Sequence, residues 1–118
     1  MNLFQQGLFT LHSGEESPFK IECDALTEAD WLTLAGMIAA RCEFGNVFGI
    51  PRGGAKLEQA LRPYIVMTSP RRLVVDDVWT TGESMKSHLC SDDIGYVVFA
   101  RKPVDDYRVG ALFTLDSR

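Results

Sequence analysis

The stretch RRLVVDDVWTTGES, residues 71–84, limits the fold more than any other part of the sequence. Its aliphatic run is typical of a buried strand, and it passes directly into two adjacent acids, Asp76 and Asp77. The hydroxyl- and glycine-rich TTGES that follows indicates a loop opening into a helix. A strand with this ending brings its last residues and the loop amides to the carboxyl edge of a sheet. The segment therefore predicts a strand that delivers a polar site.

The remaining sequence alternates between strand and helix patterns. Residues 1–26 predict two short strands joined by the turn-forming HSGEESP, and Thr27 predicts the N-cap of a helix that runs up to Gly45. The further elements, in chain order, are a strand at 46–50, a turn at 51–54, a helix at 55–61 that Pro63 stops, a strand at 72–77, a loop at 79–82, a helix at 83–90, and strands at 95–100 and 109–115. This alternation predicts an α/β fold with a mostly parallel open sheet flanked by helices. At 118 residues the chain is expected to form one domain, 1–118.

Charge and cysteine content exclude several classes of partner. The formal net charge of −4 gives no general attraction for nucleic acid or for an anionic membrane. No apolar run approaches the length of a membrane span, and the start MNLFQQGLF lacks the features of a signal peptide. Cys23, Cys42 and Cys90 form no metal or disulfide pattern and are expected to be buried or idle thiols. These features predict a cytoplasmic protein without nucleic acid or membrane partners.

The polar residues of 76–84 suggest one kind of ligand. Loop amides bind phosphate without cationic side chains, the hydroxyls of TTGES add donors, and Gly82 lets the backbone come close to a ligand. Asp76 and Asp77 are acceptors, suited to vicinal hydroxyls or, through water, to Mg²⁺. A ribose 5-phosphate carries both groups: a phosphate for the loop amides and hydroxyls, and vicinal hydroxyls for the two acids. The alternative is that two adjacent acids form only a solvated strand end and a helix cap.

Taken as a whole, VVDDVWTTGES resembles the phosphoribosyl-pyrophosphate (PRPP) signature of the type I phosphoribosyltransferases. GIPRGG, residues 49–54, looks like the pyrophosphate loop of the same family, although such a stretch alone could be a mere turn with a solvated cation. The resemblance implies that ribose and 5-phosphate are bound by Asp76, Asp77, Thr80, Thr81, Gly82, Glu83 and Ser84. It implies that pyrophosphate is bound by Arg52, Gly53 and Gly54.

The N-terminal part is similar to the hood of orotate phosphoribosyltransferases. LFTLHSGEESPFKIECDAL, residues 8–26, follows the hood pattern, with Phe19 at its aromatic position and His12 where many members carry lysine. VVFARKP resembles the segment whose arginine holds the orotate carboxylate. The resemblance therefore implies a hood segment, 1–26, and a core, 27–118. It implies a base site formed by Ser13, Gly14, Ser17, Phe19 and Arg101, while Phe9 and Phe19 are expected to be core aromatics on either interpretation.

The function implied by the resemblance is transfer of ribose 5-phosphate from PRPP to a nitrogenous base, of which orotate is one candidate, with release of pyrophosphate. Mg²⁺ would be carried by PRPP and by water near Asp76 and Asp77, without direct protein ligands. No catalytic residue is assigned. Family members often form homodimers, and the oligomeric state stays open at this stage.

One departure from the family pattern opens an alternative. Family enzymes usually carry a long flexible loop before the strand that bears the paired acids, and that loop often brings a catalytic lysine. Here the interval is only RPYIVMTSPRR, residues 62–72. The four-residue turn SPRR cannot join parallel neighbours, so YIVMTS is expected to run antiparallel or to lie outside the sheet. Arg71 or Arg72 could partly replace the cation of the missing loop, but surface arginines in a turn are expected to be solvated. A non-catalytic PRPP- or nucleotide-binding module is therefore the second hypothesis.

Overall fold

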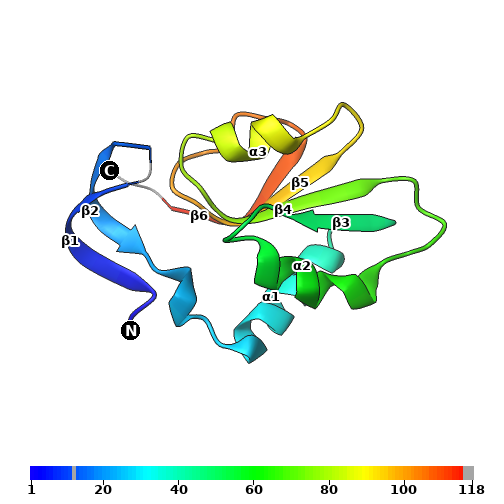
Figure 1. Cartoon of the computed structure of the whole chain (residues 1–118), viewed down its shortest axis with the longest axis horizontal. Helices are drawn as coiled ribbons and strands as arrows, with labels where there is room; N and C mark the ends of the chain where they lie inside the picture. Colours follow the sequence, from blue (N-terminus) through cyan, green and yellow to red (C-terminus); the bar gives the residue numbers. More distant parts are fainter. Residues whose placement is uncertain (12, 116–118) are drawn as a thin grey trace.

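The computed structural model describes residues 1–11 and 13–115 (Figure 1). Four strands form one sheet in the order β3-β4-β5-β6, and every neighbouring pair is parallel, while β1 and β2 form a separate antiparallel hairpin. This confirms the predicted α/β fold. The elements are β1 (Phe4–Thr10), β2 (Glu16–Ile21), the 3-10 helix η1 (Cys23–Ala25), α1 (Glu28–Ala39), β3 (Asn46–Gly49), α2 (Ala55–Leu61), the 3-10 helix η2 (Arg62–Tyr64), β4 (Arg72–Trp79), α3 (Glu83–His88), β5 (Ile94–Ala100) and β6 (Val109–Thr114).

Helix α1 begins where the sequence predicts and ends earlier. Thr27 and Asp30 form a capping box, in which the Thr27 side chain accepts from the Asp30 N–H and Asp30 accepts from the Thr27 N–H. The helix stops at Ala39, before Gly45. At Gly45 the chain meets the segment that precedes β4, since a Cβ atom there would lie 1.9 Å from the Ser69 carbonyl oxygen. The chain must therefore leave the helix early enough to enter β3 beside that segment.

The sheet is covered on both faces (Figure 1). Along β4, Leu73 and Val75 belong to the core cluster that contains residues of α1 and α2, whereas Val74 packs in a second cluster with Met85 of α3. Alternate side chains of a strand point to opposite faces, so α3 lies on the face opposite to α1 and α2. The strands β3, β4 and β5 lie side by side in chain order, and α2 and α3 lie on opposite faces of the sheet. The crossover from β3 to β4 and the crossover from β4 to β5 therefore have opposite handedness.

The order of the core strands decides how the two ligand loops meet. In many open α/β sheets ligands bind where the strand order reverses. The four described core strands lie side by side in chain order and show no reversal. The loops after β3 and β4 are brought together because these two strands are direct neighbours.

The interval between α2 and β4 lies outside the sheet, as one of the two expected alternatives had it. Its ends pack at the amino end of the sheet, where the Val66 N–H donates to the Phe44 carbonyl and the Gly45 N–H donates to the Arg71 carbonyl. The open edge of β3 therefore has no strand beside it in the described part of the chain. Side chains cap this edge instead: the Gly49 N–H donates to Glu58 at 2.8 Å, and the Val47 N–H donates to Asn46 at 2.9 Å.

The β1–β2 hairpin lies beyond the end of the sheet at which β3 and β4 finish (Figure 1). Phe4 of the hairpin meets Phe99 of β5 edge to face, with ring centroids 5.7 Å apart. Phe9 and Phe19, expected as core aromatics, are only half-buried. The expectation was wrong because both belong to a two-stranded hairpin that has no second layer of its own to bury them.

The described residues contain no disulfide, and all three cysteines are free thiols. Cys23 is buried, Cys42 is half-buried and Cys90 is exposed, so only one of the three is a core residue. None of the helices in the described residues combines the length and the apolar character needed to cross a membrane.

Candidate functional site

The two predicted ligand loops lie side by side at the carboxyl edge of the sheet. Gly49, the last residue of β3, pairs with Val75 of β4 in parallel register. The loop 50–54 then folds against the end of β4, where a Cβ atom on Gly53 would lie 2.4 Å from Oδ1 of Asp77. Only glycine fits there without moving the carboxylate. The structure thus brings Gly53 of one motif into direct contact with Asp77 of the other.

Polar burial is concentrated at this edge. Among the described residues the buried polar or charged side chains are Ser17, Asp76 and Arg101. Asp76 lies on β4 and Arg101 follows β5 directly, while Ser17 comes from the hairpin. Buried polar groups are expensive unless they are paired, so their gathering at one edge of a small domain indicates a site rather than chance.

The two acids differ in environment. Asp76 is 9% exposed. Its burial, followed by the hydrogen bond and charge of Asp77, raises the pKa of the Asp76 carboxyl group to about 8. Each carboxylate also accepts a backbone N–H at 2.8 Å, that of Asp77 for Asp76 and that of Val78 for Asp77. At neutral pH the unliganded Asp76 therefore keeps its proton.

Cys23 lies beside this acid pair, and no sequence motif indicated this position. Burial, and after it the charge of Asp77, raises the pKa of the Cys23 thiol to about 12. The thiol therefore stays protonated at neutral pH and is no nucleophile there.

The TTGES loop has a backbone suited to an anion. Gly82 has φ +84°, and a Cβ atom there would lie 2.3 Å from the buried Trp79 ring, so glycine is required by both conformation and space. Within the described residues the N–H groups of Thr80, Thr81 and Gly82 make no hydrogen bond outside regular elements. Helix α3 has six residues. Its dipole is therefore short, and the loop amides rather than the helix are the main donors.

The other residues of this loop make local contacts. Glu83 and Ser84 are exposed at the start of α3, and the Glu83 N–H donates to the Thr81 hydroxyl at 3.4 Å. Two residues missed by the sequence prediction support the loop. Trp79 lies beneath it, and the Lys86 ammonium group lies 5.5 Å from the Trp79 ring centroid.

The loop 51–54 leaves its cationic side chain open. Arg52 is exposed and forms no ion pair or side-chain hydrogen bond with the other described residues. The loop itself is tied by backbone hydrogen bonds from Gly54 to the Ile50 carbonyl and from Ala55 to the Arg52 carbonyl. The Pro51–Arg52 peptide bond is cis. Arg52 is thus available to an anion that reaches this loop.

The predicted base site is assembled only in part. Arg101 is 8% exposed, and its Nη2 donates to the Ser17 hydroxyl and, at 2.6 Å, to the Phe19 carbonyl. Its guanidinium also lies 4.0 Å from the centroid of the Phe19 ring. Ser13 and Gly14 are exposed in the hairpin turn, and their backbone and side-chain hydrogen bonds are local. His12 lies outside the described residues.

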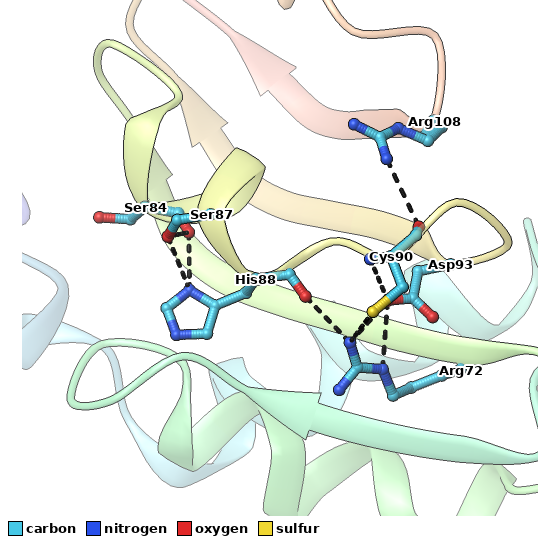
Figure 2. Close-up of polar contacts among 7 residues, drawn as sticks. All are labelled: Arg72, Ser84, Ser87, His88, Cys90, Asp93 and Arg108. Atoms are coloured by element: carbon cyan, nitrogen blue, oxygen red, sulfur yellow. Dashed lines mark hydrogen bonds and ion pairs between the residues drawn. The ribbon is translucent and has the colours of Figure 1, made fainter.

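Arg72 is not the solvated turn residue that the sequence suggested. It starts β4, and its guanidinium donates to Asp93 at 2.6 Å and to the His88 carbonyl at 2.9 Å (Figure 2). Because Arg72 and Asp77 lie at opposite ends of the same strand, Arg72 cannot replace a lid cation at the carboxyl edge. It instead ties the end of α3 and the turn before β5 to the sheet.

Mg²⁺ was also expected at this edge of the sheet. The described residues contain no group of three His, Cys, Asp or Glu side chains placed to hold a metal ion. Two adjacent carboxyl groups at the carboxyl edge fit an ion that is carried mainly by a ligand and reaches the protein through water.

Several solved structures have a similar fold. The orotate phosphoribosyltransferase from Aeropyrum pernix superposes with a TM-score of 0.73 and 22% identity, over 96% of this chain and 88% of that chain. The UMP synthase of Leishmania donovani superposes with a TM-score of 0.73 and 19% identity, over 96% of this chain and 34% of that chain. The xanthine-guanine-hypoxanthine phosphoribosyltransferase of Helicobacter pylori superposes with a TM-score of 0.53 and 19% identity, over 76% of this chain and 81% of that chain.

No family model and no curated protein sequence matches the chain. The fold of the type I phosphoribosyltransferases, which the sequence motifs predicted, is confirmed by these superpositions.

Proposed function

We propose that the chain is a compact phosphoribosyltransferase, which transfers ribose 5-phosphate from PRPP to a nitrogenous base and releases pyrophosphate. The observation that carries the proposal is the contact between Asp77 and Gly53. It brings the residues proposed for ribose and those proposed for pyrophosphate to neighbouring positions, as a single PRPP molecule requires. The shared fold supports the proposal.

The proposed roles follow from the chemistry of each group. Asp76 and Asp77 accept hydrogen bonds from the ribose hydroxyls, and the amides and hydroxyls of Thr80, Thr81, Gly82 and Ser84 hold the 5-phosphate. Glu83 lies at the start of α3 and closes the same loop. Arg52 and the backbone of Gly53 and Gly54 hold the pyrophosphate. Breaking the bond between C1 and pyrophosphate builds positive charge on the ribose, so donors that neutralise the leaving group lower the barrier. Mg²⁺ on the diphosphate supplies further neutralisation when it is bound.

For the base we propose an acidic pyrimidine such as orotate. A guanidinium holds a carboxylate in a planar, two-bonded fork, and Arg101 is a buried guanidinium close to the hood. Ser17 and Phe19 lie in contact with Arg101 and complete one wall. Ser13 and Gly14 belong to the proposed site only if the hairpin turn moves toward the core.

A second candidate, a non-catalytic PRPP- or nucleotide-binding module, is favoured by one observation. The interval 62–71 lies at the amino end of the sheet, where its backbone bonds to Phe44 and Gly45. The paired acids lie at the opposite end, so this interval provides no lid over them. A site without a lid admits water, which slows transfer and hydrolyses part of the PRPP.

A time course with PRPP, Mg²⁺ and a panel of pyrimidine and purine bases separates the two candidates. Mass spectrometry follows the nucleotide, pyrophosphate and free ribose 5-phosphate. We expect slow formation of orotidine monophosphate together with some ribose 5-phosphate. The control is the double variant Asp76→Asn with Asp77→Asn. If none of the bases leads to pyrophosphate release with the wild type, as with the control, only the binding module remains.

Two further expectations belong to this proposal. Three free thiols fit a reducing compartment, so we propose a cytoplasmic location. We also propose that residues 1–118 form one domain. A homodimer is a separate proposal, and light scattering would measure the oligomeric state.

A further inference from the structure

In the part of the chain that the structure describes, one polar side chain joins the hairpin to the core by hydrogen bonds. Within the described residues, every hydrogen bond between 1–22 and 27–115 is donated by Arg101. Its acceptors, Ser17 and Phe19, lie 84 and 82 positions earlier in the sequence. Other contacts between the two parts include the Phe4 ring against the Phe99 ring and the Arg101 guanidinium over the Phe19 ring. Arg101 therefore has a strong influence on whether the hairpin stays on the core.

The buried guanidinium depends on these hairpin acceptors. Arg101 is 8% exposed and forms no ion pair with the other described residues. Burial lowers the pKa of its guanidinium, and the charge of Glu15 acts in the opposite direction. The Ser17 hydroxyl is itself fixed, because it donates to the Phe19 carbonyl at 2.8 Å and accepts from the Phe19 N–H at 3.2 Å. The hairpin thus presents a preformed pair of acceptors to Arg101.

A carboxylate that reached Arg101 would compete with this pair. A guanidinium holds a carboxylate in a two-bonded fork through either of two edges, one formed by Nε and Nη2 and the other by Nη1 and Nη2. Nη2 is common to both edges. In this structure Nη2 is the atom that donates to both Ser17 and Phe19. A two-bonded grip on a ligand and the full contact with the hairpin therefore require the same donors.

We propose that Arg101 is a ligand-released latch: in the unliganded chain its hydrogen bonds to Ser17 and Phe19 hold the hairpin on the core. A carboxylate-bearing base takes over these donors and loosens the hairpin, which stays beside the base as one wall of its site. The part of this inference that concerns the base rests on the proposed function. The part that concerns the latch does not, because it follows from contacts of the unliganded chain.

Amide hydrogen exchange of the unliganded chain tests the latch. Arg101→Gln removes the charge and most donors, and Ser17→Ala removes one acceptor while leaving the arginine. We expect both to raise the exchange rate of amides in β1 and β2 by roughly tenfold or more, with β4 and β5 unchanged. The matched control is Lys102→Gln, at the exposed neighbouring position. If the hairpin amides of Ser17→Ala exchange at the wild-type rate, the latch is overturned. Should Arg101→Gln fail to fold, the exchange rates of Ser17→Ala alone decide whether the latch exists.

The same measurement with added orotate or uracil tests the release. The two pyrimidines differ in the carboxylate, so only orotate should raise hairpin exchange in the wild type. Slower or unchanged hairpin exchange with orotate up to its solubility limit would overturn the release. Neither experiment contains PRPP or measures turnover. A failed latch and a failed transferase assay are therefore distinguishable outcomes.

Discussion

The carboxylate of Asp77 lies against the α-carbon of Gly53, and a methyl group on that carbon would approach Oδ1 to 2.4 Å. The two residues belong to different motifs, one after β3 and one within β4, which pair in parallel. The pairing of two neighbouring strands thus sets the spacing between the acid pair and the loop proposed for pyrophosphate. Any side chain at position 53 changes that spacing.

Gly53→Ala should therefore weaken PRPP binding. The added methyl group displaces the Asp77 carboxylate from its position, and loss of a charged hydrogen bond to a ribose hydroxyl costs about 1.5–3 kcal/mol, or roughly tenfold or more in affinity. Calorimetry with PRPP and Mg²⁺ measures the change. Gln59→Ala, at an exposed position of α2, is the control. Unchanged affinity in Gly53→Ala would show that Asp77 does not bind the ligand from this position.

Asp76→Asn should stabilise the fold at slightly alkaline pH. In the unfolded chain an aspartic acid loses its proton near pH 4, about 3.9, whereas burial raises the pKa of folded Asp76 to about 8. Between these values the folded state binds more protons than the unfolded state. The contribution of Asp76 to the free energy of unfolding is therefore fully present below about pH 4 and is lost as the pH rises through about 8.

The asparagine carries no such proton. The stability of the variant should therefore depend less on pH and exceed that of wild type at pH 8 by several kcal/mol, at about 1.4 kcal/mol for each unit of pKa difference between folded and unfolded Asp76. Urea denaturation at several pH values measures this. Parallel pH profiles for the two proteins would mean that Asp76 titrates normally.

Arg52→Ala should affect PRPP much more than ribose 5-phosphate. Arg52 is exposed in the loop 51–54, and among the three phosphates of PRPP it is proposed to meet only the pyrophosphate. Loss of one charge-assisted contact should weaken PRPP by roughly tenfold. Equal losses for PRPP, ribose 5-phosphate and a nucleoside monophosphate would place Arg52 elsewhere.

The strands and both ligand loops could be predicted because their signals are local. VVDD and NVFG are short aliphatic runs followed by turn residues, and such runs are strands in many contexts. The extra length of β4, which runs to Trp79, was missed because Val78 and Trp79 follow two acids that look like the end of a strand.

The contacts between distant parts could not be predicted in this way. The bonds of Arg101 with Ser17 and Phe19 join positions 84 and 82 apart, and no local pattern marks their partners. Arg72 was mistaken for a solvated residue because its partner, Asp93, is 21 positions away. The order of the strands also depends on long-range packing. Motif order along the chain does not determine it.

Glu58→Ala should destabilise the open edge of β3. Glu58 accepts the Gly49 N–H at 2.8 Å through one oxygen and pairs with Arg62 at 2.6 Å through the other. The alanine leaves the strand N–H without its partner, at a cost of about 1–2 kcal/mol. Arg62→Ala is the matched control, since it removes only an exposed ion pair worth roughly 0.5 kcal/mol. Equal losses in the two variants would assign the effect to the ion pair.

The pH dependence of the same site has a defined sign. The hydrogen bond from Gly49, followed by the contact with Arg62, lowers the pKa of the Glu58 carboxyl group. Its stabilising effect is therefore present above the pKa of the unfolded glutamic acid and is lost as the pH falls through the lowered value. The difference between wild type and Glu58→Ala should shrink in acid.

Arg72→Ala should reduce stability and leave PRPP affinity unchanged. Arg72 joins Asp93 and the His88 carbonyl, and Asp93 also accepts the Cys90 N–H at 2.8 Å (Figure 2). Removal of the guanidinium leaves the Asp93 carboxylate without its cation, and we expect a loss of about 1–3 kcal/mol in the free energy of unfolding. Arg71→Ala, at the exposed position before it, should have little effect on stability. Because Arg72 lies at the amino end of β4 and the acid pair lies toward its carboxyl end, calorimetry with PRPP should give the wild-type affinity. A selective loss of PRPP binding in a stably folded Arg72→Ala variant would mean that the amino end of the sheet contributes to the ligand site after all.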